Sequence, residues 1–418
     1  MQMRETANLE FKREVSKTFL KTVSAFANYG TGNIVFGIDD NGETVGLDNP
    51  KQDALNIENA INDSIVPAPR FEVTIDEVAG TVTLTVFEGP SKPYTCKGKA
   101  YRRSDSATVE VDRLEFGRLV LSGSNTSFDA LEATEQDLRF GALSAELSSK
   151  AGITKLDDNA LISLELKSPG GAFNNAAALL ADENRFFGTD IARFGDSINI
   201  MLSRRILERQ SVLKQLASAM DMFDEHYTYE EIAGFERVKR ELIPREAFRE
   251  AIANALVHRA WDVSGSINVQ MLPDRIEVSS PGGLPHGVSE ESYLAGGPSI
   301  VRNPILANVL FRLGHIERFG TGIPRIIDAY AALSVSPSFR ISEESVTVVL
   351  PAEGAIDLTQ DERLILDAIP KGSSRTRAEI ESEACVSKDK AIRILNALLD
   401  KKSITKSGSG RATRYSRI

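Results

Sequence analysis

The spacing of hydrophobic and polar residues predicts an α+β domain in the N-terminal part of the chain. Within residues 17–29, four apolar residues share one helical face: Leu20, Val23, Phe26 and Ala27. The apolar run Asn33–Ile38 is typical of a buried strand, and Phe71–Val78 and Thr81–Phe87 alternate as the strands of a hairpin do. These elements predict a first domain over residues 1–121.

A polar stretch rich in glycine and serine, Ser122–Ser127, predicts a boundary after this domain. The next region, residues 128–245, mixes short strands with helices and shows no chemical motif. Its longest predicted element is a helix around Arg204–Met222. We therefore expect this region to connect two domains.

A second α/β sandwich is predicted over residues 246–353. The helix Arg245–His258 leads into two paired strands, Ser266–Leu272 and Arg275–Ser279. Two glycine-containing turns follow, of which the second opens a further helix: Pro281-Gly282-Gly283 and Gly320-Thr321-Gly322. Residues 354–360 are predicted to be a linker.

The end of the chain, residues 358–418, predicts an independent winged helix-turn-helix module. Three short helices are expected, in this order: Asp361–Ile369, Thr376–Ala384 and a third that Ser387 caps and that runs to Asp400. In the third helix the residues expected to face inward are Ile392, Leu395 and Leu399. Ser403–Lys406 and Thr413–Arg417 flank a glycine- and serine-rich tip and predict a hairpin, the wing. The fold class is therefore α+β and multidomain.

Composition narrows the class of protein. With 42% hydrophobic and 26% charged residues, the chain belongs with ordinary globular proteins. Cys96 and Cys385 lie far apart and the histidines are scattered, which argues against a disulfide framework and against a structural zinc site. No apolar run is long enough to cross a membrane, so a soluble protein of the cytoplasm is expected.

The charge is unevenly distributed along the chain. The net charge of −10 argues against a protein that coats DNA along its whole surface, but Lys371 to Ile418 has twelve Lys/Arg and five Asp/Glu. The cations expected to contact DNA lie on the third helix and on the wing: Lys388, Lys390, Arg393, Arg411 and Arg414. The alternative is a protein-docking module in which these charges form only a solvated face.

Motifs near the N-terminus resemble those of the Schlafen AlbA-like domain. They comprise Glu5, Glu10-Phe11-Lys12, Ala25-Phe26-Ala27-Asn28, Gly32, Gly37-Ile38-Asp39-Asp40, Lys92-Pro93-Tyr94 and Tyr101-Arg102-Arg103. The glycine pair that usually precedes the strand is Gly30-Thr31-Gly32 in this chain. The resemblance implies nucleic-acid binding, with Lys12, Arg102 and Arg103 as the contacting cations.

The same resemblance implies a possible metal-dependent ribonuclease. In some Schlafens three carboxylates of this motif act together, and the matching positions are Glu5, Glu10 and Asp40. Three convergent carboxylates can hold Mg²⁺ or Mn²⁺, with Glu10 and Asp40 as ligands. In the alternative interpretation Glu10 and Lys12 pair with neighbours and the aspartates only form a turn.

The helix Arg249–Arg259 resembles the glutamate–asparagine helix of the GHKL ATPases, and more closely the module labelled as the C-terminus of an ATP-dependent helicase. Glu250 and Asn254 are four residues apart, which places them on one helix face. The resemblance implies Glu250 as general base and Asn254 as Mg²⁺ ligand. The other residues implied for ATP are His258, Gly282, Gly283, Gly320 and Gly322.

One position departs from the GHKL pattern. The aspartate that contacts adenine in GHKL proteins is replaced by Ser279 or Ser280. The cavity could therefore hydrolyse ATP, sense a nucleotide or another ligand, or be a packed sandwich whose glycines only make turns. Because helicase motifs and a Walker A sequence are lacking, the chain is not expected to be a helicase.

Three functions remain open at this stage. The first is a DNA-binding transcriptional regulator, a homo-oligomer whose middle module senses a ligand or holds a dimer. The second is an enzyme, either an ATPase that uses Glu250 or a nuclease that uses Glu5, Glu10 and Asp40. The third is an interaction protein of a defence or toxin system, for which the sequence offers no direct support.

Overall fold

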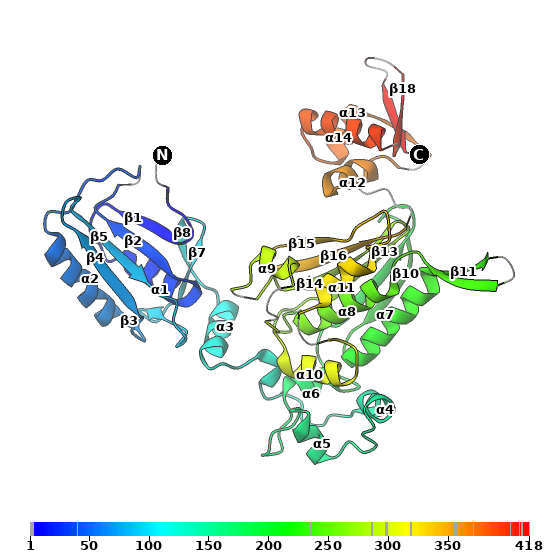
Figure 1. Ribbon diagram of the computed structural model, residues 1–418, viewed down its shortest axis with the longest axis horizontal. Helices are drawn as coiled ribbons and strands as arrows, with labels where there is room; N and C mark the ends of the chain where they lie inside the picture. Colours follow the sequence, from blue (N-terminus) through cyan, green and yellow to red (C-terminus); the bar gives the residue numbers. More distant parts are fainter. Residues whose placement is uncertain are drawn as a thin grey trace. The chain divides into compact units, whose positions relative to one another are not determined.

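The computed structural model divides into two units, Met1–Leu131 and Glu132–Ile418. The residues that it describes are 4–39, 41–233, 236–285, 287–296, 300–317, 320–353, 358–370, 372–401, 403–408, 410 and 413–417. Each unit mixes helices and sheets, so the predicted mixed α/β class is confirmed (Figure 1). The boundary lies a few residues beyond the polar stretch that predicts it, because helix α3 (Arg113–Gly123) extends into that stretch.

The first unit is built around a four-stranded sheet of order β1-β2-β5-β4. Its strands are β1 (Leu9–Lys12), β2 (Gly32–Phe36), β4 (Phe71–Asp76) and β5 (Thr81–Val86). Helices α1 (Phe19–Tyr29) and α2 (Pro50–Ser64) pack against it. Short strand pairs complete the unit: β3 (Ile65–Val66) with β6 (Thr95–Cys96), and β7 (Tyr101–Ser104) with β8 (Ala107–Glu110). The predicted helix, buried strand and hairpin are confirmed.

The second unit contains a six-stranded mixed sheet of order β10-β9-β13-β14-β16-β15. Its strands are β9 (Thr189–Phe194), β10 (Met201–Leu207), β13 (Ile267–Leu272), β14 (Arg275–Pro281), β15 (Ser338–Ile341) and β16 (Ser345–Pro351). Helices α7 (Val212–His226), α8 (Arg245–His258) and α11 (Gly322–Ala329) cover one face of this sheet (Figure 1). The buried residues of β13 alternate along the strand because every second side chain points toward those helices.

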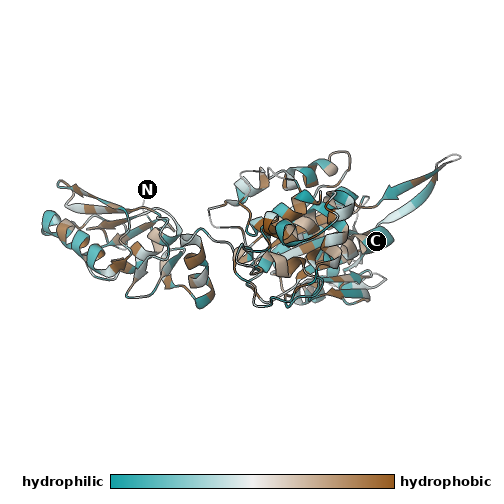
Figure 2. Ribbon diagram, turned by 90° about the horizontal axis from the view of Figure 1, so that it is seen from below, coloured by the Kyte–Doolittle hydropathy of each residue, from teal (hydrophilic) through white to brown (hydrophobic). Residues whose placement is uncertain are grey.

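Shorter elements surround the sheet. They are α4 (Gly141–Lys150), α5 (Asp158–Ser163), α6 (Asn175–Leu180), α9 (Glu290–Leu294), α10 (Pro304–Arg312) and the hairpin of β11 (Thr228–Ala233) with β12 (Glu236–Glu241). Figure 2 shows hydrophobic positions gathered inside each unit, whereas this hairpin is mostly hydrophilic and projects from its unit. No helix among the described residues is long and apolar enough to cross a membrane.

The prediction of a long helix over Arg204–Met222 is wrong in its first part. Residues Met201–Leu207 form strand β10, which pairs with β9, and the helix α7 begins only after Ser211. The Ser211 hydroxyl accepts a hydrogen bond from the backbone N–H of Leu213 and so caps the helix. Because β10 is an edge strand with exposed side chains on both faces, its sequence lacks the alternation that identifies a strand.

The last residues fold as three helices and a three-stranded antiparallel sheet. The order along the chain is α12 (Gln360–Asp367), β17 (Ser374–Thr376), α13 (Arg377–Glu383), α14 (Lys388–Asp400), β18 (Ile404–Ser407) and β19 (Arg414–Arg417). The predicted hairpin of the last two strands is confirmed. Capping boxes that start from Thr359 and Thr376 fix the first turns of α12 and α13.

The predicted inner face of α14 is partly wrong. Leu395 is buried as expected, but Ile392 is exposed and Leu399 is only partly buried. The other buried positions are Ala391, Ile394 and Leu398. Ser387 occupies the N-cap position, but its side chain makes no capping hydrogen bond. The true face contains a small alanine, which a search for large apolar residues overlooks.

Arg259, at the end of α8, is the largest fully buried side chain among the described residues. Its guanidinium donates to the backbone carbonyls of Phe187, Gly188, Val263 and Gly265. It also lies 4.3 Å from the centre of the Trp261 ring, measured from Cζ. Burial lowers the pKa of Arg259 to about 10, so the side chain is still protonated at neutral pH. One cation thus joins the loop before β9 to the loop before β13.

Replacing Arg259 with alanine is expected to destabilise the second unit by about 4 kcal/mol, because several buried carbonyls lose their donor. Arg259→Lys keeps the positive charge but lacks the planar, forked guanidinium group, so an intermediate loss of stability is expected. Urea unfolding followed by tryptophan fluorescence would measure both, since Trp261 is the single tryptophan of the chain. Equal losses for the two variants would contradict a role for the fork.

Candidate functional site

Two segments of the N-terminal motif are hydrogen-bonded to each other in the first unit. The Asn28 side chain donates to the carbonyl of Tyr94 and accepts from the Tyr94 N–H, both at 2.8 Å. The Ser24 hydroxyl donates to the same carbonyl. Asn28 is completely buried, and its amide group satisfies both backbone polar groups of Tyr94, as a neighbouring strand would do. This contact joins two motif segments that are distant in the sequence.

Glu10 lies in a buried polar cluster. Its carboxylate pairs with Arg103 at 2.5 Å and with Lys12 at 2.7 Å, and it accepts a hydrogen bond from the Thr22 hydroxyl. Glu5 accepts from the backbone N–H of Phe11. The third carboxylate predicted for a nuclease, Asp40, lies outside the described residues. Glu10 is therefore already compensated by two cations in this arrangement.

The cations predicted to contact DNA from this unit differ in their surroundings. Arg103 is buried against Glu10 and also donates to Thr108, and Lys12 shares the Glu10 carboxylate. Arg102 is partly exposed and lies 3.4 Å from Glu115. Among the residues described, no group of three or more His, Cys, Asp and Glu side chains is arranged to hold a metal ion.

In the second unit, one cavity brings together the residues predicted for nucleotide binding. Helix α8 is buried over most of its surface, and its residues Glu250, Asn254 and His258, spaced by four, line a cavity of about 450 Å³. Four glycines also line this cavity: Gly282, Gly283, Gly320 and Gly322. This volume is within the range of small-molecule sites.

Helix α11 begins directly against the glutamate–asparagine pair. A Cβ atom on Gly322 would lie 2.5 Å from Asn254 Nδ2 and 2.7 Å from Glu250 Oε1. Glycine at this position therefore lets the helix N-terminus approach these two side chains without displacing them. The first N–H groups of a helix have no intrahelical acceptor and favour anions. The contact thus places potential phosphate donors beside a carboxylate and an amide.

The glycine turn after β14, Pro281-Gly282-Gly283, is equally close to its surroundings. Gly282 has a φ of 95° and packs against Ala260 and Arg302, and a Cβ on Gly283 would lie 2.6 Å from the carbonyls of Ser342 and Glu343. Arg302 donates to the Gly283 carbonyl at 2.9 Å. These contacts hold the turn after β14 at the cavity wall.

Two polar atoms that line the cavity have no hydrogen-bond partner among the described residues. They are Oε2 of Glu250 and Oγ1 of Thr321, and both are buried. Burial raises the pKa of Glu250 despite the nearby Arg249 and Arg325. A buried polar atom without a partner is costly unless water or a ligand satisfies it. Thr321, within the triplet Gly320-Thr321-Gly322, was not among the predicted site residues, although its position in that motif could have identified it.

The residues present therefore fit a nucleotide with Mg²⁺. Magnesium is usually bound by one or two protein oxygens together with phosphate oxygens and water, so a three-carboxylate group is not needed. Asn254 and Glu250 can supply the protein oxygens, and Thr321 with the α11 N-terminus can donate to phosphate. When bound, the metal would supply charge neutralisation for the phosphates.

The expected base-contacting end of the cavity is mainly apolar. Ser280 lines the cavity, but its hydroxyl donates to the carbonyl of Ala255 at 3.0 Å. Ser279 instead shares a hydrogen bond with Thr347. The apolar side chains of the lining were not predicted from the sequence; they include Val278, Phe311, Ile323, Val346 and Val348. Apolar side chains thus form a large part of the cavity lining.

His258 is neutral in the folded state at physiological pH. Burial and the positive charge of Arg302 lower the pKa of His258 to about 4. In the unfolded chain the imidazole takes up a proton near pH 6.5, whereas the folded chain resists it down to about pH 4. The unfolded state therefore binds more protons between these values, and stability is lost as the pH falls through this window.

The second unit is expected to lose about 2 kcal/mol of stability through His258 when the pH falls from 7 to 5. Urea unfolding of the wild type and of His258→Asn at both pH values measures the effect, because the variant lacks this titrating group. An equal loss in both proteins would contradict a neutral, buried His258.

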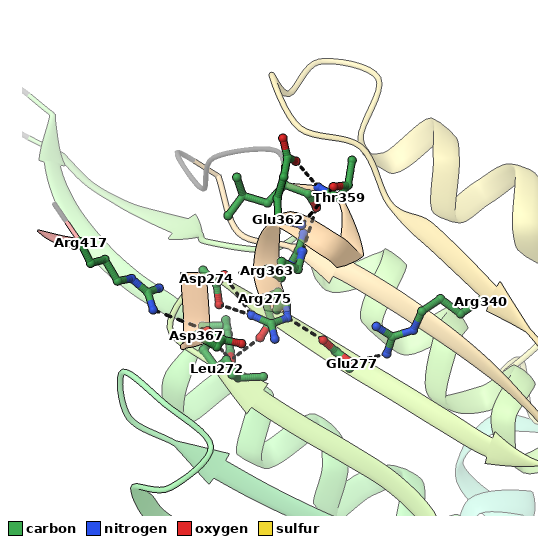
Figure 3. A network of polar contacts seen from close by, with 12 residues as sticks. Leu272, Asp274, Arg275, Glu277, Arg340, Thr359, Glu362, Arg363, Asp367 and Arg417 are labelled. Carbon is green, nitrogen blue, oxygen red and sulfur yellow. Dashed lines mark hydrogen bonds and ion pairs between the residues drawn. The ribbon is translucent and has the colours of Figure 1, made fainter. Parts of the chain in front are cut away.

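A network of charged side chains joins β14 to the C-terminal helices (Figure 3). Arg275 is buried between Asp274 and Glu277, at 3.0 and 2.6 Å, and Glu277 also pairs with Arg340. Arg363 of α12 lies 3.9 Å from Asp274, and the charge of Arg275 also acts on Asp367 of α12. The strand β14 thus presents Val278 and Ser280 to the cavity and Arg275 and Glu277 to this network.

Some cations predicted for DNA binding are paired within the C-terminal helices. Lys390 lies 2.8 Å from Asp361, and Arg414 donates to the Ser374 carbonyl. Lys388 and Arg393 are exposed on α14, and Arg411 lies outside the described residues. Over residues 358–418 the chain has thirteen cations and eight acids, a net charge of +5. The count made from the sequence starts at Lys371 and therefore leaves out the acids of α12. These acids reduce the excess of positive charge in the C-terminal residues.

Two family models match separate parts of the chain. Residues 5–112 match the model described as "Schlafen, AlbA_2", and residues 265–350 match the model described as "Putative ATP-dependent DNA helicase recG C-terminal". The chain therefore contains an AlbA_2-type domain followed by a helicase-C-terminal-type ATPase-like domain, as the two resemblances predicted. The helix α8 with Glu250 and Asn254 lies just before the second matched range.

Two solved structures show more distant similarity. The DIP2311 protein from Corynebacterium diphtheriae is 18% identical, with 99% of this chain and 95% of that chain covered and a TM-score of 0.47. The N-terminal domain of a "Putative ATP-dependent DNA Helicase RecG-related Protein" from Nitrosomonas europaea is 29% identical over 27% of this chain and 85% of that chain, with a TM-score of 0.20. No curated protein matches the chain.

Proposed function

We propose that this protein is a DNA-binding transcriptional regulator whose second unit binds a nucleotide with Mg²⁺ in the α8–α11 cavity. The observation that supports this most strongly is the gathering of Glu250, Asn254 and Gly322 around one cavity, where two buried oxygens have no hydrogen-bond partner among the described residues. The descriptions of both matching families, which refer to Schlafen AlbA and to a DNA helicase, agree with a role on nucleic acid.

In this proposal the protein side chains position the phosphates. The α11 N-terminus and the Thr321 hydroxyl donate to phosphate oxygens, while the amide oxygen of Asn254 and the carboxylate of Glu250 face the cation. Glu250 is also placed to accept a proton from an attacking water, provided that it is ionised. Burial raises the pKa of Glu250, which makes its carboxylate a stronger base than an exposed one.

The C-terminal residues form the proposed winged helix. Their order of helices and strands, with α14 after a short turn and the hairpin of β18 and β19 behind it, suits insertion of α14 into the major groove. Lys388 and Arg393 are exposed on α14, and Arg414 lies on the hairpin, where it can reach phosphates. A dimer would present two such modules to paired half-sites.

The strand β14 offers a route from the cavity to the DNA-binding module. Alternate residues of one strand contact the proposed ligand and the charged network, so a shift of the strand affects both sides. Ligand binding would then alter the contact of Arg275 and Asp274 with α12. This connection supports sensing rather than turnover as the main role of the cavity.

Titration of a fluorescent ATP analogue with the full chain, with and without Mg²⁺, tests the proposed cavity. We expect Mg²⁺-dependent binding that Asn254→Ala weakens by about tenfold, the loss of one charged contact. Asn268→Ala, on the exposed side of β13, is the matched control and should bind normally. If the wild type does not bind, or if Asn254→Ala binds equally well, a nucleotide role for this cavity is wrong.

A further inference from the structure

The strand β10 is an open edge of the six-stranded sheet in the second unit. Within the described residues it pairs only with β9, and it ends the strand order β10-β9-β13-β14-β16-β15. The backbone N–H and C=O groups on its outer side therefore face away from the sheet. Such an edge is a template for another strand, and natural proteins usually cover or protect it.

This edge is unusually apolar for an uncovered strand. Met201, Leu202 and Ile206 are all more than half exposed, and Ile198 and Ile200 in the preceding turn are exposed to a similar degree. Five exposed aliphatic side chains within nine residues exceed the scattered apolar residues of an ordinary surface. Across the rest of the described chain, the exposed large hydrophobic residues are more dispersed.

The charges of β10 are already compensated inside the same unit. Arg204 forms a two-pronged contact with Asp190 of β9, at 2.9 and 2.5 Å, and Arg205 contacts Glu225 of α7 at 3.1 Å. Arginines on an edge can repel an approaching strand, but these two are held by acids of their own unit. The register of β10 against β9 shifts between Met201 and Ser203, and residues 203–207 pair regularly with β9.

The sequence of β10 is complementary to itself in the antiparallel direction. If two copies meet around a twofold axis at Arg204, the two Arg204 residues lie opposite each other and Ser203 lies opposite Arg205, while Leu202, at the register irregularity, comes near Ile206 of the other copy at each end of the contact. Exposed aliphatic side chains of the two copies then lie close together, and each Arg204 keeps its own Asp190, which compensates the charges of the opposed arginines. Main-chain hydrogen bonds would join the two sheets into one.

We propose that β10 is the homodimer interface of this protein, with a second copy of the chain added antiparallel at the same strand around Arg204. An isologous contact of this kind closes on itself and leaves no further free β10 edge. The proposal is independent of any ligand in the α8–α11 cavity. It also differs from dimerisation through the C-terminal helices, which would leave the β10 side chains exposed.

Sedimentation equilibrium of the full chain, over a range of concentrations, tests the interface. We expect the wild type to have twice the mass of the 45.6 kDa chain, and the double variant Leu202→Lys, Ile206→Lys to have the mass of one chain. The control, Val78→Lys with Ile232→Lys, changes two other exposed side chains and should remain a dimer. A monomeric wild type, a dimeric β10 variant or a monomeric control would each overturn the proposal.

Cysteine crosslinking tests the register in the folded protein. Opposed residues of antiparallel strands have Cα atoms about 4.5–5.5 Å apart, which a disulfide can span. In a Cys385→Ser background, which removes the exposed cysteine, Arg204→Cys should crosslink two copies under mild oxidation. Ser203→Cys is offset from its own copy and should not. Crosslinking at Ser203 but not at Arg204 would overturn the proposed register.

Discussion

Gly322→Ala is expected to lower the affinity of the cavity for Mg²⁺-nucleotide by about a hundredfold, or about 2.7 kcal/mol. The added methyl group would lie 2.5 Å from Asn254 Nδ2 and 2.7 Å from Glu250 Oε1, so both side chains must move. Because these are the ends of flexible side chains, they can move without unfolding the unit. Alanine is also the better residue at a helical position, so α11 itself should be retained.

Isothermal titration of the folded variant measures this effect, with thermal unfolding as a check on the fold. The matched control is Gly170→Ala, where an added Cβ meets only the Ser168 hydroxyl at 3.7 Å. It should bind nucleotide as the wild type does. Unchanged affinity in Gly322→Ala would show that the Glu250–Asn254 pair does not contact the ligand.

Reversing two exposed charges on α14 is expected to reduce DNA affinity strongly. Lys388→Glu with Arg393→Glu removes two potential phosphate contacts, which should lower the slope of log affinity against log salt by about 2. At moderate ionic strength the affinity itself should fall by about a hundredfold. Both positions are exposed, so the helix and its buried face of Ala391, Ile394 and Leu398 should be unaffected.

Fluorescence anisotropy of labelled DNA over a salt series measures both quantities. The control has the same change in net charge but alters cations elsewhere: Lys155→Glu with Arg237→Glu, both exposed. Its binding should stay close to that of the wild type. An equal loss in both variants would indicate a general charge effect rather than contact through α14.

The elements found correctly from the sequence are those whose burial is one-sided. The alternation of β4 and β5 and the turn between these two strands follow directly from burial on one side of the hairpin. The strand β10 was missed because both of its faces are exposed and its arginines pair with Asp190 and Glu225, so no alternation remains. Its assignment depends on pairing with β9, which is a tertiary property.

The candidate site could be predicted in its polar residues but not in its shape. Spacing by four residues places Glu250 and Asn254 together, and the glycine triplet places Gly322 at a helix start. The apolar wall, with Phe311 and Val348, is brought to the cavity by the fold alone. The burial of Arg259 could not be predicted from the sequence either, because the carbonyls that accept its hydrogen bonds belong to two separate loops.

The pairing of cations also required the structure. Counting charges from Lys371 onward omits α12, whose acids Asp361, Glu362 and Asp367 contact Lys390, Lys401 and Arg417. The number of cations available to DNA is therefore smaller than the sequence suggests. In the same way, Glu10 and Arg103 of the first unit, predicted for metal and for DNA respectively, are partners of each other.

The most direct test of the proposed regulator is the binding of genomic DNA fragments, over a salt series, by the full chain and by a chain truncated at residue 354. The truncation leaves Arg275 between Asp274 and Glu277, so the buried charge stays compensated. We predict specific, salt-sensitive binding by the full chain and a loss of about a thousandfold on truncation. Specific binding that survives truncation, or that the full chain never shows, would contradict DNA recognition by the C-terminal residues.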